Sequence, residues 1–191
     1  MKKFNILITG GAGYIGSMLS TKLINLGNKV TVIDILEYDT RSLSHLYLDK
    51  NFTFIRRDVR DKNFMKKIIR KFDYVIPLAG LVGAPLCEKR KKDAKEINFE
   101  VVKDLVSFLS KKQKIIFTNS NSGYGIGSKT KFCDENSPLN PISLYGRTKV
   151  EAEKVVMNFP NSISFRLATV FGYSYRMRTD LLLNNLVLLS L

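Results

Sequence analysis

Short apolar runs alternate with amphipathic segments along almost the whole chain of 191 residues. The runs have the length and composition of buried strands, and they predict strands over residues 4–9, 29–34, 52–56, 74–78, 114–118 and 162–167. Apolar residues between them recur at helical spacing, which predicts helices over 13–26, 61–71, 93–110 and 143–158 and a weaker helical turn over 42–48. Strands and helices that alternate across short connections form a parallel sheet covered on both faces. The pattern therefore predicts a doubly wound α/β fold.

The first apolar run leads directly into a glycine-rich turn, Thr-Gly-Gly-Ala-Gly-Tyr-Ile-Gly at residues 9–16. Gly10, Gly13 and Gly16 allow a tight reversal, a close approach of phosphate to the backbone, and close packing of helix on strand. The helix N-terminus adds free N–H groups and a partial positive charge for the anion. Asp34 ends the second strand about twenty residues further on, where a carboxylate binds a ribose. This combination predicts a dinucleotide site on a Rossmann-type fold, and a strand–turn–helix without ligand is the alternative.

Composition narrows the class of protein. A hydrophobic content of 45% and a charged content of 25% are typical of one globular domain. His45 is the only histidine, which excludes a histidine-based metal site, and we expect no metal. Cys87 and Cys133 are too few for a disulfide framework, which fits a cytoplasmic protein. The leucine-rich tail at 181–191 is too short to cross a bilayer, so no membrane partner is expected.

The formal net charge of +14 raises the question of nucleic acid binding. Basic clusters are scattered along the chain and do not alternate with aromatic residues or glycines, as an RNA-binding surface would. We therefore expect no nucleic acid partner. An anionic small molecule would be attracted by the same field.

A candidate catalytic pair opens the predicted helix at 143–158. Tyr145 and Lys149 are four residues apart, so their side chains project from one face. An ammonium beside a phenol lowers the phenol pKa from about 10 toward working pH, which makes Tyr145 a candidate general acid or base. Chance alone predicts about one Tyr–Lys pair at this spacing in a chain of this composition. The position of the pair in the chain is therefore stronger evidence than its existence. The pair follows a long loop at 119–142 and a strand end rich in hydroxyl groups, at the sheet edge where ligands bind.

These motifs, in this order, resemble the extended short-chain dehydrogenase/reductases, the NAD-dependent sugar epimerase/dehydratase family. The resemblance covers nearly the whole chain and implies NAD as cofactor and a nucleotide sugar as substrate. It implies these cofactor contacts: Gly10, Gly13, Tyr14, Ile15, Gly16, Asp34, Asp58, Val59, Leu78, Ala79, Gly80 and Lys149. It also implies Ser120, Tyr145 and Lys149 as catalytic residues, with Thr118 and Ser122 as alternative hydroxyls. Tyr145 would exchange a proton with a sugar hydroxyl while hydride passes to or from the nicotinamide.

The chain departs from the family pattern at three places. Pro77 stands where the family usually has histidine, and Thr169 replaces an asparagine that touches the nucleotide sugar, which leaves the substrate open. Residues 121–122 are Asn-Ser, where the dehydratases carry Asp-Glu, so dehydration is disfavoured. Family members continue further, and the resemblance implies an NAD-binding domain at 1–172, with 173–191 starting a largely missing substrate region.

The predicted helix at 93–110 carries two apolar stripes, although a helix that covers a sheet needs only one. The second stripe comprises Phe99, Val102, Val106 and Leu109. It favours a subunit interface over extra core, and the resemblance implies a homodimer through this helix and the one bearing Tyr145. The sequence thus predicts an NAD-dependent epimerase or oxidoreductase for a nucleotide-activated sugar. A reductase of a non-sugar carbonyl and a non-catalytic dinucleotide-binding fragment are the open alternatives.

Overall fold

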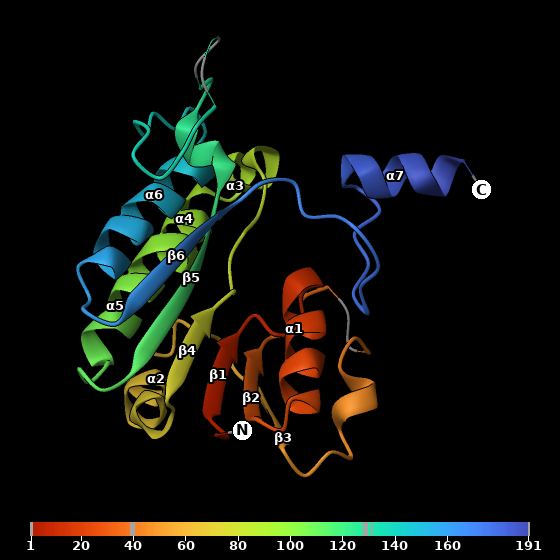
Figure 1. Cartoon of the computed structure of the whole chain (residues 1–191), viewed down its shortest axis with the longest axis vertical. Helices are drawn as coiled ribbons and strands as arrows, with labels where there is room; N and C mark the ends of the chain where they lie inside the picture. Colours follow the sequence, from red (N-terminus) through yellow and green to blue (C-terminus); the bar gives the residue numbers. More distant parts are fainter. Residues whose placement is uncertain (1, 39–40, 128–129, 131, 191) are drawn as a thin grey trace.

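The computed structural model describes residues 2–38, 41–127, 130 and 132–190. Residues 128, 129 and 131 of the predicted long loop and residue 191 of the predicted tail therefore lie outside the described part. Six parallel strands form one sheet in the order β3-β2-β1-β4-β5-β6 (Figure 1). The strands are β1 (Asn5–Thr9), β2 (Lys29–Asp34), β3 (Phe52–Arg56), β4 (Tyr74–Pro77), β5 (Lys114–Ser120) and β6 (Ser162–Leu167). The strand order reverses between β1 and β4, which places a crevice at the carboxyl ends of these strands.

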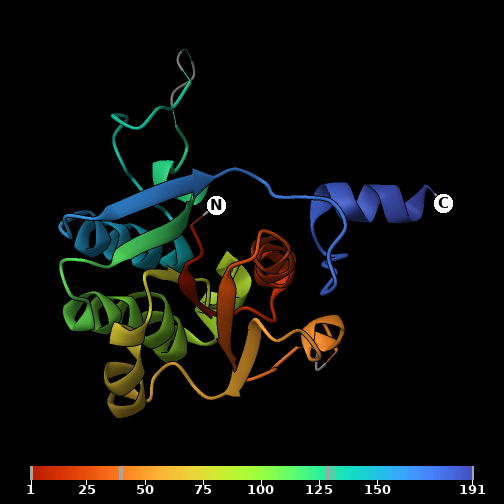
Figure 2. The same ribbon diagram turned by 60° about the horizontal axis from the view of Figure 1, so that its bottom comes forward.

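Helices lie on both faces of the sheet, as the sequence predicts. On one face α1 (Tyr14–Asn25) lies against β1 and β2 (Figures 1 and 2). The other face carries α2 (Lys62–Ile68), α3 (Ala84–Lys89), α4 (Lys91–Lys95), α5 (Val101–Phe108) and α6 (Leu144–Met157). The alternation within β1 explains the two layers: Ile6 and Ile8 pack in the core under α1, and Leu7 packs in the other core. The predicted Rossmann-type fold is confirmed.

Short helical turns complete the connections. The 3₁₀ turns are η1 (Ser44–Leu46), η2 (Ile69–Lys71) and η4 (Asn121–Tyr124). Two helices begin where a side chain satisfies a free backbone N–H. Asp61 accepts from the N–H of Phe64 at 3.0 Å before α2, and Ser143 accepts from the N–H of Gly146 at 3.0 Å before α6. In the described part of the chain, none of the helices combines the length and apolar character that crossing a bilayer requires.

Two helices were not expected from the pattern. α3 begins directly after Gly83, whose φ is +93°, and has Pro85 in its first turn, so the Gly-Ala-Pro sequence resembles a loop although proline is favoured there. α7 (Leu182–Leu189) forms within the leucine-rich tail and stands apart from the sheet in both views (Figures 1 and 2). The predicted helix at 93–110 is in fact α4, a π-helical turn η3 (Glu96–Glu100) and α5.

The second apolar stripe of this helical segment is divided between core and surface. Val102 and Leu109 are buried inside the chain, so they belong to the core that α5 forms with the sheet. Phe99 and Val106 are only partly buried and pack at the margin of that core. Extra core therefore accounts for half of the stripe that suggested an interface.

Candidate active site at the carboxyl edge of the sheet

One cavity of about 840 Å³ lies at the crevice between β1 and β4. Its volume is within the range of small-molecule and cofactor sites. The cavity is lined by every residue that the sequence predicts for the cofactor and for catalysis: Gly10, Gly13, Tyr14, Ile15, Gly16, Asp34, Asp58, Val59, Leu78, Ala79, Gly80, Ser120, Tyr145 and Lys149. Residues separated by up to 139 positions in the sequence thus share one pocket, although their individual roles stay predictions.

The glycine turn is packed so closely that side chains are excluded at two of its positions. Gly10 has a φ of +71°, and a Cβ there would press against the backbone N of Ala79 and lie 2.6 Å from the Ala79 Cα. A Cβ on Gly16 would lie 2.6 Å from the carbonyl oxygen of Gly10. Gly13 precedes α1 as its N-cap and lines the cavity, and its nearest obstacle is the Gly10 oxygen, 3.2 Å from an added Cβ. The turn therefore offers bare backbone and a helix N-terminus to the cavity, which suits a phosphate.

Asp34 is held in place by the same turn. One carboxylate oxygen accepts a hydrogen bond from the N–H of Ala12 at 3.0 Å, and the other accepts from the N–H of Leu36 at 2.8 Å. Each carboxylate oxygen can accept a second bond. Because the group also lines the cavity, it can accept hydrogen bonds from hydroxyl groups of a ligand there.

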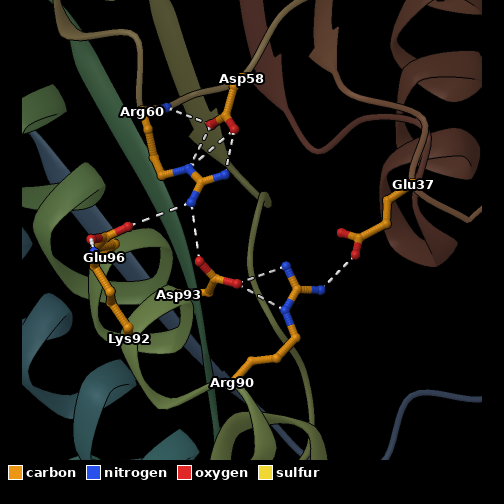
Figure 3. Close-up of polar contacts among 7 residues, drawn as sticks. All are labelled: Glu37, Asp58, Arg60, Arg90, Lys92, Asp93 and Glu96. Carbon is orange, nitrogen blue, oxygen red and sulfur yellow. Dashed lines mark hydrogen bonds and ion pairs between the residues drawn. The ribbon is translucent and has the colours of Figure 1, made fainter.

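An ion-pair chain borders the end of the cavity near Asp58 (Figure 3). Arg60 donates to both oxygens of Asp58 and continues to Asp93 at 3.1 Å, and Arg90 then links Asp93 to Glu37 at 2.6 Å. The Arg60 guanidinium holds the pKa of Asp58 below its usual value. These pairs are about one-third exposed, so each contributes little to stability. Together they connect the loops that follow β2 and β3.

The loop after β4 is fixed by a buried amide. Asn98, on the π-helical turn η3, accepts from the N–H of Leu81 at 2.8 Å and donates to the Leu81 oxygen at 2.9 Å. A Cβ on Gly80 would lie 2.9 Å from the Asn98 Oδ1, so this amide fits closely against the loop. A π-helical turn often marks a functional site. Here it aims a side chain at the cavity wall formed by residues 78–81.

The three predicted catalytic residues come from β5 and α6. Ser120 ends β5, and its hydroxyl donates to the Oγ of Ser122 at 3.0 Å and accepts from the Ser122 N–H at 3.2 Å. The same hydroxyl interacts with the phenol of Tyr145, in the first turn of α6. Lys149 follows one turn later, with its Nζ 4.0 Å from the centre of the Phe117 ring. Ser120 is therefore both a backbone cap and a neighbour of the Tyr145 hydroxyl.

The predicted lowering of the Tyr145 pKa by Lys149 is wrong for this structure. Burial raises the pKa of Tyr145 above its usual value, and Cys87 adds to the rise. Burial also lowers the pKa of Lys149 to about 7, against the effect of Glu153, so its charge is only partial at neutral pH. The neighbouring Ser120 hydroxyl and the charge of Arg178 act the other way and favour the phenolate. Burial therefore decides the direction of the Tyr145 pKa shift, and helical spacing in the sequence does not report burial.

The segment after β6 adds residues that the sequence did not indicate. Arg176 and Arg178 line the cavity, and the Arg176 guanidinium lies 4.7 Å from the centre of the Tyr38 ring. The segment is anchored on α1, because Ser174 is buried and its hydroxyl donates to the backbone carbonyl oxygen of Tyr14 at 2.7 Å. Asn184, at the start of α7, donates to the Tyr14 hydroxyl at 3.1 Å. Part of the predicted substrate region therefore contacts the cofactor half directly.

Comparison with known proteins identifies the family. The model of the NAD-dependent epimerase/dehydratase family matches residues 6–187. A UDP-N-acetyl-α-D-glucosaminuronate decarboxylase of Bacillus cytotoxicus is 34% identical over 149 residues, which are 78% of this chain and 44% of that protein. A UDP-glucose 4-epimerase of Lactobacillus helveticus is 34% identical over 158 residues, with 79% and 46% covered.

Solved structures agree with this assignment. A UDP-N-acetylglucosamine 4-epimerase from Methanobrevibacter ruminantium, in complex with UDP-N-acetylmuramic acid, has a TM-score of 0.84 at 28% identity, covering 94% of this chain and 59% of that chain. A UDP-glucuronic acid 4-epimerase from Bacillus cereus, in complex with UDP-glucuronic acid and NAD, has a TM-score of 0.83 at 28% identity, covering 96% and 62%. The chain belongs to the NAD-dependent epimerase/dehydratase family, and it spans less than half the length of the two sequence relatives.

Proposed function

For this member of the NAD-dependent epimerase/dehydratase family, we propose an NAD-dependent epimerase or oxidoreductase activity on a nucleotide-activated sugar. One observation carries the proposal: the glycine turn, Asp34 and the group Ser120, Tyr145 and Lys149 all open into one cavity. A dinucleotide and a reacting sugar would therefore meet there. The named activities of the relatives, on UDP sugars, support the substrate class.

The residues present fit NAD. Gly13 and the N-terminus of α1 would hold the pyrophosphate, and Asp34 would bind the adenosine ribose. Asp58 would lie beside the adenine, with its carboxylate already shared with Arg60. The loop at 78–80 would border the dinucleotide on the β4 side, and Lys149 would hold the nicotinamide ribose. When bound, NAD supplies reversible hydride acceptance from a sugar carbon.

The chain's own residues would move the proton. Tyr145, as phenolate, would accept the proton of the sugar hydroxyl while the carbon loses hydride, and as phenol it would return that proton when hydride comes back. Ser120 would hold the same sugar oxygen by a hydrogen bond. Arg178, from the segment after β6, would stabilise the phenolate. Return of hydride to the opposite face of the sugar carbon gives epimerisation.

A substrate panel tests this proposal. The chain is incubated with NAD and, separately, with UDP sugars, UDP uronic acids and non-sugar carbonyl compounds, and products are identified by NMR. Conversion of a nucleotide sugar that requires Tyr145 supports the proposal. Turnover confined to non-sugar carbonyls would identify the reductase instead, and NAD binding without any turnover would identify a binding module. Cytoplasmic location stays a prediction of the composition.

Cofactor preference follows from Asp34. We expect NAD to bind about tenfold or more tightly than NADP, because the carboxylate accepts ribose hydroxyls and repels a 2′-phosphate. Arg57 also lines the cavity, but its guanidinium pairs with Asp61 at 3.3 Å and lies over the Phe64 ring, away from a phosphate role. Calorimetric titration of both cofactors measures the preference, and Asp34→Ser should reduce it. Equal or tighter NADP binding by the unaltered chain would contradict the role of Asp34.

We also propose a homodimer through α5 and α6. The two helices pack against one another on the same face of the sheet, and Val106 on α5 and Phe99 on the preceding turn η3 remain partly exposed. Val106→Lys should convert the dimer to a monomer in sedimentation velocity, because a charge would enter an apolar contact. Ser107→Lys, at the neighbouring exposed position, is the matched control and should leave the dimer intact. A monomeric unaltered chain would refute the interface.

A further inference from the structure

A buried carboxylate lies directly behind the candidate catalytic residues. Glu153 is on α6, one turn beyond Lys149, and only 4% of its surface is exposed. Its two oxygens accept from Arg166 Nε at 3.1 Å, from Asn119 Nδ2 at 3.0 Å and from Ser164 Oγ at 2.6 Å. The partners come from the two strands β5 and β6. A single side chain thus connects α6 to both strands that border the catalytic end of the cavity.

The network reaches Ser120 through one intermediate. Asn119, with 3% of its surface exposed, donates its amide N–H to Glu153, and its Oδ1 accepts from the backbone N–H of Ser120 at 2.7 Å. Arg166 extends the network in the other direction. It donates to the Tyr124 hydroxyl at 3.3 Å and to the backbone carbonyl oxygen of Glu135 at 3.0 Å. The position of the Ser120 backbone is therefore set by an amide that the Glu153 carboxylate orients.

Stability alone does not explain a charged pair at this place. Burying a carboxylate and a guanidinium carries a desolvation cost that their attraction does not reliably repay, and well-packed apolar residues are often as stable. The pair does something that apolar residues could not do. Glu153 places a negative charge one helical turn from Lys149, and this charge favours the Lys149 ammonium against burial. Arg166 balances that charge from the far side.

We propose that Glu153 is a positioning residue for the candidate site, which orients Ser120 through Asn119 and sustains the charge of Lys149 in balance with Arg166. The proposal rests on the proposed function for its catalytic consequence only. The charged or titratable groups around the site are Tyr145 and Glu153 on α6, Cys87 on α3, Arg166 on β6 and Arg178 after β6. Because Glu153 and Arg166 carry opposite charges, removing each of them should shift the pKa of Lys149 in opposite directions.

The first measurement is the titration of Lys149 by NMR in the chain labelled with ¹³C-lysine, assigned with Lys149→Met. The unaltered chain should titrate near the pKa of about 7. Glu153→Gln should shift the midpoint down by about one pH unit or more, since the attractive charge is lost and Arg166 is left unbalanced. Arg166→Gln should shift it up, and the double variant should return toward the unaltered value. Glu151→Gln, an exposed position on the same helix, is the matched control and should change nothing.

The second measurement uses turnover of a nucleotide sugar. Glu153→Gln should lower kcat roughly ten- to a hundred-fold and move the alkaline limb of the pH profile to lower pH, while KM changes little. The double variant should recover the pH profile. If the Lys149 midpoint stays put in all these variants, or moves down in both single variants, the electrostatic role is wrong. If Glu153→Gln does not fold, the upward shift in Arg166→Gln still decides. A chain without turnover refutes the proposed function, and the NMR titration still tests Glu153.

Discussion

Tyr145→Phe is expected to lower turnover of the nucleotide sugar by about 10²- to 10⁴-fold while the affinity for NAD stays within about twofold. The variant removes only the hydroxyl that would exchange the proton, and the ring continues to pack against the core around α6. Since the phenol is a pocket-lining group in the first turn of α6, the variant should not alter the glycine turn at residues 9–16. Single-turnover kinetics and calorimetric titration of NAD measure the two effects separately.

A matched variant distinguishes loss of the proton-transfer group from general damage to the pocket. Tyr124→Phe removes another phenol hydroxyl at the same edge of the sheet. This hydroxyl donates to the backbone carbonyl oxygen of Asp134 at 2.9 Å, and Tyr124 does not line the cavity. It should retain most of the activity. If Tyr145→Phe keeps more than a few per cent of the turnover, a different group transfers the proton, and Ser120 and Lys149 are then the residues to test.

Much of the fold was predictable because its strands are local features. Each apolar run became a strand to within about two residues at each end, and the alternation of strand and helix specified a parallel sheet. The position of the glycine turn between β1 and α1 was predictable for the same reason. Gly16 packs against Gly10 within the turn itself, and Asp34 accepts from Ala12 in the same β1–α1–β2 unit. The packing of Gly10 against Leu78 and Ala79, at the exit of β4, is a distant contact that the local pattern does not report.

The missed features depend on contacts between distant residues. Arg178 lies 33 positions after Tyr145. It reaches the cavity because Ser174 before it and Asn184 after it are both hydrogen-bonded to Tyr14. The Glu153–Arg166 pair joins a helix to an edge strand, and the sequence does not show that Glu153 is buried or that Arg166 is partly buried. The raised pKa of Tyr145 has the same origin, since burial outweighs the neighbouring positive charge. Helical spacing identified the pair of side chains but not their surroundings.

Gly10→Ala should lower the free energy of unfolding by about 2–5 kcal/mol. The backbone at Gly10 has a φ of +71°, which a side chain rarely adopts, and the added methyl group would meet the backbone of Leu78 and Ala79 on the neighbouring strand exit. Neither obstacle is the end of a flexible side chain, so the turn and the end of β4 would have to move apart. Urea unfolding followed by circular dichroism measures the loss. Stability equal to that of the unaltered chain would mean that the turn does not pack against β4 in solution.

Gly13→Ala separates this structural requirement from the proposed cofactor role of the same turn. The residue has φ −77° and ψ −177°, which alanine adopts freely, and an added Cβ would lie 3.2 Å from the Gly10 oxygen, a contact that small shifts relieve. Stability should therefore change by less than about 1 kcal/mol. The methyl group would nevertheless occupy the cavity at the N-terminus of α1, the proposed pyrophosphate site, so NAD affinity should fall about tenfold or more. Unchanged NAD binding by a folded Gly13→Ala chain would place the phosphates elsewhere, and equal destabilisation by both variants would show that Gly13 serves packing alone.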